Sequence, residues 1–554
     1  RRLFIHNRRS TTKFDEEPKN MNKILLILFF IGNILNTTII RGQNTCPLIP
    51  YPQSSSRINE TFQLSSRCVI VYTEEFESQA YLLQKELLRY TSIAVSTLPD
   101  KATLDSNIVY NVIKLKKDYK FKSEGYSLKM HTKDITITAG QPSGMINGVM
   151  SLVQLTRLST LQNTLVPIEC WEIEDSPLYA WRGFMLDEAR HFWGMKKVKQ
   201  ILNWMALYKL NRFHWHLTDS QGWRIEIKKY PKLALIGGIG NYGEEYTPAQ
   251  FYTQEEIKEI VTYALERNIH IIPEIDMPGH ASAASKAYPE FSGGGSPKYP
   301  GYTFNPGKDS VYTYLTDILK EVDALFPSQV IHLGGDEVHY GNQDWNTNKD
   351  IQDLMKHEKM KNLKDVENYF FQRMADSLLL IHNKVAAWDE VADSQLSPEH
   401  TIVFFWRQNR PEQLQKSLDR KFNIVLCPRL PMYLDYAQDT LQVHGVDWRK
   451  FSYNSYQKVY SFSPQDIPVK YPKNCNILGI QANLWTERIE TEDRLDYMLF
   501  PRMAALAENA WTKEKNKNIN SFNIRLKKQF NLYKKDHIYY SDPFTPKETG
   551  EPVR

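Results

Sequence analysis

The strongest constraint on the fold is a series of short apolar segments that alternates with amphipathic segments from residue 181 onward. The apolar segments are almost continuously hydrophobic, which is typical of strands buried on both faces of a parallel sheet. There are eight such strand candidates: Trp181–Leu186, Phe213–Leu217, His270–Ile275, Val330–Leu333, Val385–Trp388, Ile402–Trp406, Ile424–Cys427 and Ile477–Trp485. Eight strands with helical crossovers predict an α/β fold of the (β/α)8 TIM barrel type.

The crossover helices are predicted where apolar residues recur at i, i+3, i+4 and i+7. They are expected around Val198–Met205, Ile257–Ala264, Val311–Leu325, Val366–His382 and Pro411–Lys421, with a closing helix at Arg494–Ala510. The Gly- and Pro-rich segment Phe291–Gly307 is expected to form a long loop over the barrel mouth.

The chain divides by pattern into several parts. Residues 45–175 mix strand and helix patterns and predict a small α/β domain without a catalytic constellation, so a scaffold role is expected. Residues 176–515 hold the predicted catalytic barrel, and 516–554 are expected to be a C-terminal tail packed on it. With 42% hydrophobic and 24% charged residues, the composition is that of a globular protein with a large core.

The N-terminal region predicts a targeting segment. Met21 is the first methionine, and a short basic stretch and the apolar run Ile24–Ile31 follow it. This run is too short to span a bilayer, so residues 21–42 are interpreted as a signal peptide and 1–20 as an upstream segment outside the fold. The expected location is the secretory pathway, either lysosomal or extracellular, without a membrane span.

Five cysteines agree with an oxidising compartment and suggest disulfide bonding, although an odd count leaves at least one unpaired within the chain. None has the Cys-x-x-Cys spacing of a metal or redox site. Asn59, in an Asn-Glu-Thr sequence, is a predicted glycosylation site. A formal charge of +5 without an aromatic-rich basic cluster gives no indication of a nucleic-acid partner.

Charged and aromatic residues gather where the predicted strands end. They are Asp187 with Arg190, Asp219, Asp276 with His280, Asp336 with Glu337, Trp388, Trp406, Tyr433 with Asp435, and Trp485 with Glu487. Active sites of barrel enzymes are built at the C-terminal ends of the strands. The sequence therefore predicts an acidic pocket with one arginine and aromatic walls, which suits a neutral polyhydroxylated ring such as a sugar.

The segment from Val330 to Glu337 is central to this pocket. Its apolar strand runs into Gly334 and Gly335 and then into adjacent carboxylates. Glycines let the backbone bend and present both acids at the mouth. Repulsion and burial would let one of them keep a proton while the other stays ionised. In isolation, the same pattern could be a strand end with two solvated acids.

Several of these motifs resemble the β-N-acetylhexosaminidases, the family-twenty glycoside hydrolases. They are His332-Leu333-Gly334-Gly335-Asp336-Glu337, Arg182-Gly183 with Leu186-Asp187 and Arg190-His191, His214-Trp215-His216-Leu217-Thr218-Asp219, Pro273-Glu274-Ile275-Asp276-Met277-Pro278-Gly279-His280, and Trp485-Thr486-Glu487. The resemblance runs from about Cys46 to Trp511 and implies an N-terminal α/β domain followed by a catalytic barrel. It implies no cofactor and no metal, and a homodimer is one assembly that it allows.

The resemblance implies a retaining exo-glycosidase that removes terminal N-acetyl-β-D-hexosamine by substrate-assisted catalysis. The 2-acetamido carbonyl of the substrate would attack C1 and form an oxazolinium intermediate. Glu337 would be the general acid and base, and Asp336 would hold the acetamido N–H.

The other site roles are also carried over from the resemblance. Arg190 and Glu487 would grip sugar hydroxyls, and Asp219 with His280 would tune Glu337. Trp388, Trp406 and Trp485 would enclose the sugar and its N-acetyl group, while Tyr433 would hold the acetamido carbonyl. Asp435, followed by Tyr436, argues for neutral rather than sulfated or acidic sugars.

Two alternatives are weighed. His214 and His216 alternate on a strand and could ligate a metal, although the later strands of this barrel end in tryptophan rather than histidine. Hydrogen-bonded, buried histidines are therefore favoured. A catalytically silent sugar-binding protein would be expected to have lost Asp336 or Glu337, and both are present.

Overall fold

The computed structural model describes residues 45–102, 111–444 and 452–553. Cys46–Arg554 form one compact unit. The predicted upstream segment 1–20 and the predicted signal peptide 21–42 lie outside the described residues. In the described part of the chain, every helix is too short or too polar to span a lipid bilayer.

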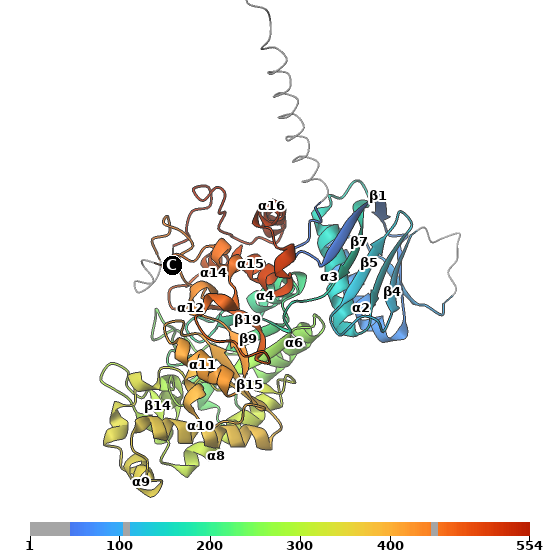
Figure 1. Cartoon of the computed structure of the whole chain (residues 1–554). Helices are drawn as coiled ribbons and strands as arrows, with labels where there is room; N and C mark the ends of the chain where they lie inside the picture. The colour runs from blue at the N-terminus through green and yellow to red at the C-terminus, as the bar shows by residue number, and fades with distance from the viewer. Residues whose placement is uncertain (1–44, 103–110, 445–451, 554) are drawn as a thin grey trace, which may run out of the picture. The chain divides into compact units, whose positions relative to one another are not determined.

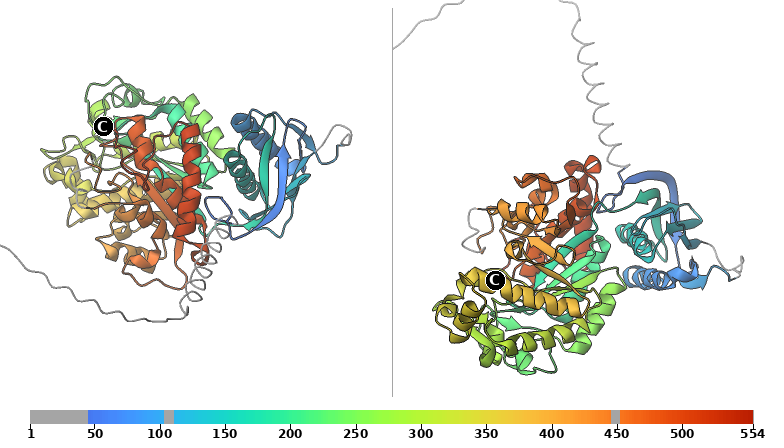
Figure 2. Two further views of the ribbon diagram at one scale, coloured as in Figure 1. Left: turned by 90° about the horizontal axis from the view of Figure 1, so that it is seen from above. Right: turned by 60° about the horizontal axis from the view of Figure 1, so that its bottom comes forward.

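The unit begins with a seven-stranded sheet in the order β1-β7-β5-β6-β4-β2-β3. Its strands are β1 (Ser54–Leu64), β2 (Val69–Tyr72), β3 (Ser96–Pro99), β4 (Val112–Lys117), β5 (Tyr126–Met130), β6 (Asp134–Ala139) and β7 (Val166–Asp175). Helices α2 (Glu77–Thr91) and α3 (Pro142–Leu158) pack together on one face, as Figure 2 shows. The sequence pattern did not predict β1, β3 or β7. Asn59, the predicted glycosylation site, lies exposed on β1.

The second part of the unit is a closed parallel barrel in the order β8-β9-β12-β15-β16-β17-β18-β19, which confirms the predicted fold class. Three of its strands, β9, β15 and β19, are labelled in Figure 1. Its strands are β8 (Trp181–Asp187), β9 (Arg212–His216), β12 (His270–Glu274), β15 (Val330–His332), β16 (Lys384–Trp388), β17 (Thr401–Phe405), β18 (Asn423–Leu426) and β19 (Asn476–Leu484). All five residues of β17 are buried, as expected for a strand covered on both faces.

Helices connect and surround the barrel strands. They are α4 (Gly194–Leu207), α5 (Lys232–Leu235), α6 (Gln254–Leu265), α7 (Ser282–Ala287), α8 (Asp309–Asp323), α9 (Lys349–His357), α10 (Leu363–Leu380), α11 (Pro411–Asp419), α12 (Arg429–Met432), α13 (Tyr456–Ser461), α14 (Glu492–Leu499), α15 (Arg502–Trp511) and α16 (Ile519–Lys535). The single closing helix predicted at Arg494–Ala510 is two helices, α14 and α15. Pro501 separates them because it has no N–H for the helical ladder.

Two short strand pairs lie in the loops at the mouth. They are β10 (Thr218–Asp219) with β11 (Gly222–Trp223), and β13 (Ser292–Gly294) with β14 (Thr303–Phe304). The second pair lies inside the segment Phe291–Gly307, which was predicted to be a long loop. The hydrogen bonds between β13 and β14 therefore hold the two arms of this loop together.

Buried ion pairs join the sheet to the first turns of the barrel. Lys209 Nζ lies 3.3 Å from Asp175 Oδ2 and donates to Tyr126 Oη at 3.1 Å. Arg182 Nη2, near the start of β8, lies 2.6 Å from Glu124 Oε1. These contacts lie at the N-terminal end of the strands, so the opposite end of the barrel stays available for a site.

Helix α16 packs beside α15 and α3. Arg525 on α16 forms a bidentate pair with Glu508 on α15, with Nη2 2.6 Å from Oε1. Tyr533 Oη also lies 2.8 Å from Tyr208 Oη of the barrel. The residues after the barrel are thereby attached to it by buried polar contacts.

The expectation of disulfide bonding is wrong for this structure. All five cysteines lie in the described ranges, and each is a free thiol. Cys46, Cys68, Cys170 and Cys427 are buried, and burial raises the pKa of Cys46 to about 12 and that of Cys170 to about 11. These buried thiols pack as small apolar side chains.

Candidate active site

The backbone after β15 has a conformation that only glycine tolerates easily. Gly334 and Gly335 have φ angles of +66° and +96°. A Cβ on Gly334 would lie 1.8 Å from Asp276 Oδ1, and one on Gly335 would lie 2.3 Å from the Phe371 ring. Glu337 follows with φ +54°, a left-handed conformation that is uncommon for a side chain of its size. The predicted glycine bend is thus present and presents both acids at the strand end.

His280 connects the two acids. Its Nε2 lies 3.7 Å from Asp336 Oδ2 and 3.9 Å from Glu337 Oε2. Its Nδ1 lies 3.0 Å from Asp219 Oδ1, and the hydroxyl of Tyr302 lies 2.8 Å from Nε2. The structure therefore brings Asp219, His280, Asp336 and Glu337 into one polar cluster.

The charges in this cluster shift its pKa values. Burial raises the pKa of Asp336 to about 6, and the neighbouring Glu337 carboxylate adds to this shift. Burial also raises the pKa of Glu337. Burial alone would lower the pKa of His280, but Asp219, Asp276 and Asp336 raise it well above its ordinary value. The site thus combines a histidine whose charged form is favoured with two carboxyl groups whose pKa values are both raised.

Arg190 forms the basic side of the pocket. Its Nη2 lies 2.8 Å from Asp219 Oδ2, its Nη1 lies 3.6 Å from Asp187 Oδ2, and its Nε donates to Gln221 Oε1 at 3.1 Å. Its guanidinium carbon lies 5.0 Å from the centre of the Trp485 ring. These contacts hold the guanidinium in one orientation beside the aromatic wall.

Four aromatic side chains form a continuous series of ring contacts. Trp388 and Trp485 have ring centroids 6.0 Å apart, Trp485 and Tyr433 6.1 Å, and Tyr433 and Trp406 6.4 Å. The last pair is stacked with an interplanar angle of 12°. Because these residues lie at or after the C-terminal ends of β16, β17, β18 and β19, the series lines one side of the mouth.

Several buried polar atoms at this mouth have no hydrogen-bond partner within the described ranges. Among them are Asp336 Oδ1, Trp485 Nε1 and Glu487 Oε2. Buried polar atoms are normally paired, and unpaired ones need an explanation. A ligand that carries both hydroxyl and amide groups would supply the missing donors and acceptor.

Asp435 is buried two residues after Tyr433, and the intervening Leu434 N–H donates to Asn483 O at 2.8 Å. The carboxylate of Asp435 acts on Tyr433, whose pKa is raised mainly by burial and in part by this charge. Asp435 therefore lies in the same turn as Tyr433 of the aromatic series.

The metal alternative at His214 and His216 meets a different arrangement. Both imidazoles approach the carboxylate of Glu274, with His214 Nε2 2.9 Å and His216 Nδ1 2.6 Å from Oε2. His216 Nδ1 forms a hydrogen bond with this carboxylate, and both imidazoles are buried. These contacts favour the buried-histidine interpretation.

Some residues with direct contacts in the site were not assigned an individual role from sequence. Among them are Gln221, Glu274, Asp276 and Tyr302. Glu274 and Asp276 stand in a motif next to His280, which was a usable signal. Gln221 and Tyr302 lie on loops where no periodicity marks them.

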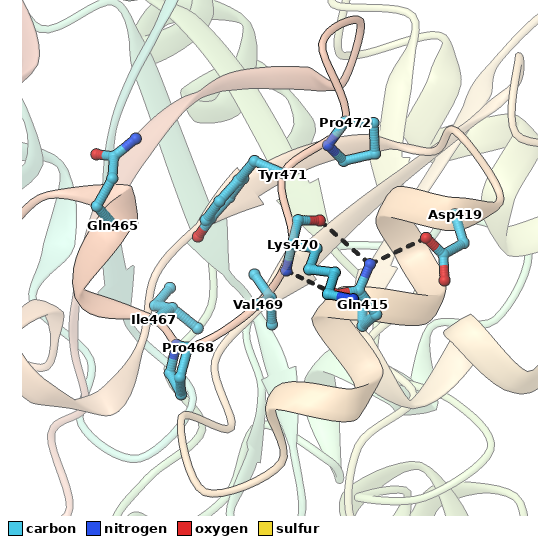
Figure 3. A pocket seen from close by; sticks show the side chains of 9 residues that line it. All are labelled: Gln415, Asp419, Gln465, Ile467, Pro468, Val469, Lys470, Tyr471 and Pro472. Atoms are coloured by element: carbon cyan, nitrogen blue, oxygen red, sulfur yellow. Dashed lines mark hydrogen bonds between the residues drawn. The ribbon is translucent and has the colours of Figure 1, made fainter.

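A separate groove lies on the flank of the barrel, between α11 and residues 465–472 (Figure 3). Gln415 bonds to the backbone of Lys470 and to Asp419 there. None of the predicted site residues lines this groove. The candidate site is therefore the barrel mouth.

The paired acids and the aromatic wall at the mouth are typical of one class of protein, the barrel enzymes that act on sugars. Two family models match the chain, namely "Glycosyl hydrolase family 20, catalytic domain" over residues 179–514 and "Glycosyl hydrolase family 20, domain 2" over residues 45–176. The chain belongs to glycosyl hydrolase family 20 and is a glycosidase.

Several known proteins are similar to it. A β-hexosaminidase from Porphyromonas gingivalis is 33% identical over 499 residues, which is 86% of this chain but only 62% of that protein. A β-hexosaminidase from Vibrio furnissii is 34% identical over 84% of this chain and 76% of its own length. The crystal structure of an exo-β-N-acetylglucosaminidase from Vibrio harveyi, in complex with N-acetylglucosamine, superposes with a TM-score of 0.81 at 32% identity, covering 90% of this chain and 79% of that one.

Proposed function

We propose that this glycosidase removes terminal β-linked N-acetylhexosamine from the non-reducing ends of oligosaccharides and glycoconjugates, with retention of anomeric configuration. The observation that carries the proposal is the placement of Asp336 and Glu337 beside His280 at the barrel mouth, next to the aromatic series. The hexosaminidase names of the relatives, and the N-acetylglucosamine bound to the Vibrio harveyi protein, support it.

The proposed first step divides the work between the two acids. The carboxyl group of Glu337 gives its proton to the glycosidic oxygen as the C1–O bond breaks. At the same time the carbonyl oxygen of the 2-acetamido group forms a bond to C1, which gives an oxazolinium ion and a free alcohol. Asp336 accepts a hydrogen bond from the acetamido N–H and stabilises the positive charge of the oxazolinium ion. Its unpartnered Oδ1 is available for this role.

The second step returns the enzyme to its starting state. A water molecule attacks C1, its proton passes to the Glu337 carboxylate, and the bond between C1 and the acyl oxygen breaks. Two inversions at C1 give net retention. Arg190 and Glu487 would hold ring hydroxyls, Trp388, Trp406 and Trp485 would enclose the acetamido group and the ring, and Tyr433 would orient the acetamido carbonyl.

The test is a panel of aryl glycosides together with a thiazoline analogue of the oxazolinium ion. We expect turnover of the N-acetyl-β-glucosaminide and N-acetyl-β-galactosaminide, weak turnover of 6-sulfated sugars because the carboxyl group of Asp435 would disfavour a sulfate, and potent thiazoline inhibition. NMR spectroscopy should show the β-anomer as the first product. Comparable rates on the plain β-glucoside would contradict attack by the acetamide. The secretory location, the glycosylation of Asn59 and the homodimer stay predictions.

A further inference from the structure

Glu274, the last residue of β12, is surrounded by ring nitrogens inside the barrel and is fully buried. Its Oε2 lies 2.6 Å from His216 Nδ1, and its Oε1 accepts a hydrogen bond of 2.9 Å from Trp388 Nε1. His214 Nε2 lies 2.9 Å from Oε2, and His332 Nδ1 lies 3.1 Å from Oε1. We call these five residues the Glu274 cluster; they join β9, β12, β15 and β16.

The surrounding imidazoles favour the ionised form of this carboxyl group. Burial would raise the pKa of Glu274, but His216, His332 and His214 lower it well below its ordinary value. Burial would lower the pKa of His216, yet Glu274 and Asp219 raise it well above the usual range. A buried carboxylate is tolerated only when it is paired and hydrogen-bonded. Glu274 and His216 are therefore an anion and a cation.

The charge alternation continues toward the mouth. His216 Nε2 lies 3.1 Å from Asp219 Oδ2, and the other oxygen of Asp219 contacts His280 Nδ1 at 3.0 Å. His280 in turn faces Asp336 and Glu337. One face of the Glu274 cluster is thereby connected to the two acids through alternating charges.

The other face of the cluster fixes the aromatic wall. Trp388 is buried, and its only side-chain donor is used by Glu274. Its ring lies 6.0 Å from Trp485, which itself packs edge-on against His216 at 4.9 Å. A rotation of the Trp388 indole would therefore break its hydrogen bond to Glu274 and disturb the wall.

We propose that Glu274 is a positioning residue for the hydrolysis reaction. It holds the Trp388 ring in the plane that the acetamido group packs against, and it keeps His216 cationic so that Asp219 and His280 stay aligned with Glu337. Because Glu274 has no exposed surface, it is not available to contact a sugar bound at the mouth. The inference rests on the proposed function for the identity of the reaction.

The decisive variant is Glu274→Gln, which keeps the shape and removes the charge. Because a displacement of about 1 Å at a reacting group can cost about 10²-fold, we expect kcat to fall by about that factor on the aryl N-acetyl-β-glucosaminide, with a smaller change in KM. The matched control is Glu508→Gln, an equally buried carboxylate that pairs with Arg525 outside the barrel. The control should lower the melting temperature while leaving kcat unchanged.

A double-mutant cycle separates positioning from simple loss of packing. Trp388→Phe removes the indole N–H, so its effect on kcat/KM and that of Glu274→Gln should be strongly non-additive if one acts through the other. Additive effects, or wild-type kcat in folded Glu274→Gln, would overturn the inference. If Glu274→Gln does not fold, Trp388→Phe still decides: a folded variant with wild-type kcat also overturns it.

The same proteins distinguish failure of this inference from failure of the proposed function. If the wild-type protein shows no turnover of N-acetylhexosaminides, the proposed function fails. The affinity for N-acetylglucosamine, measured by calorimetry, then tests the role of Glu274 directly. Weaker binding by Glu274→Gln than by Glu508→Gln supports the inference, and equal binding contradicts it.

Discussion

Nε2 of His280 lies 3.9 Å from Oε2 of Glu337, so the proposed acid works beside a cation that three carboxylates hold in its charged form. Burial raises the pKa of Glu337, while His280 acts in the opposite direction. A general acid is most effective when its pKa lies near the working pH. The opposing effects allow Glu337 to give a proton in the first step and to take one back in the second.

Glu337→Gln tests the acid role. The amide cannot donate a proton to the leaving oxygen, so we expect kcat on a substrate with a sugar leaving group to fall by about 10²–10⁴-fold with little change in KM. Stopped assays on a β-linked N-acetylglucosamine disaccharide measure this. An aryl substrate with an acidic phenol should lose less, because its leaving group needs less protonation. Equal losses on both substrates would argue against the assignment.

For Asp336→Asn we predict a loss of catalysis together with a gain in stability that depends on pH. The pKa of Asp336 is raised from near 4 in the unfolded chain to about 6, mainly by burial. Its ionised form therefore destabilises the fold increasingly as pH rises from about 4 to about 6, and constantly above that. At pH 7.5 the variant should be more stable than the wild type by up to about 3 kcal/mol.

Chemical denaturation at several pH values checks this prediction. Near pH 4 the stabilities of wild type and Asp336→Asn should converge, because both carry a neutral side chain there. A difference that is constant across the whole pH range would show that the substitution acts through packing rather than through charge.

Gly335→Ala tests the backbone that presents the acids. The new Cβ would meet the Phe371 ring at 2.3 Å, and φ of +96° is strained for any L side chain. We expect a loss of about 1–3 kcal/mol in stability. Activity should fall as well, because Asp336 and Glu337 move with the bend. Gly550→Ala is the control, since its Cβ would meet nothing within 4 Å; it should match the wild type in melting temperature and rate.

The cysteine finding is also open to direct test. In denatured, unreduced protein, five thiols per chain should react with a chromogenic disulfide reagent, because all five cysteines are free. Reducing agent should leave the melting temperature unchanged. A count of three or one, restored to five by reduction, would show that disulfides form in the purified protein.

The barrel could be predicted from sequence because its strands are covered on both faces and are therefore continuously apolar, as β17 shows. The strands β1 and β3 lie at the two edges of the first sheet and carry mostly exposed or partly exposed side chains, so neither gave a hydrophobic signal. The break at Pro501 was visible in the sequence but was outweighed by the apolar residues on both sides.

The types of residue at the mouth were also predictable, since they follow each strand directly. Their partners were not. The bond from Trp388 to Glu274 joins residues 114 positions apart, and it depends on how adjacent strands are staggered. The same stagger sets Glu274 opposite His216 and His332 in the sheet, which periodicity cannot reveal.

The buried pairs that tie Lys209 and Arg182 to the first sheet have a consequence for dissecting the protein. Cutting the chain before β8 would leave these two cations without their carboxylates, and Arg267 on the same side would lose Glu86, 2.8 Å away. Each orphaned buried charge is strongly destabilising. The catalytic half should therefore be recovered in soluble form only when the preceding half is produced with it, in one polypeptide or as a co-expressed fragment.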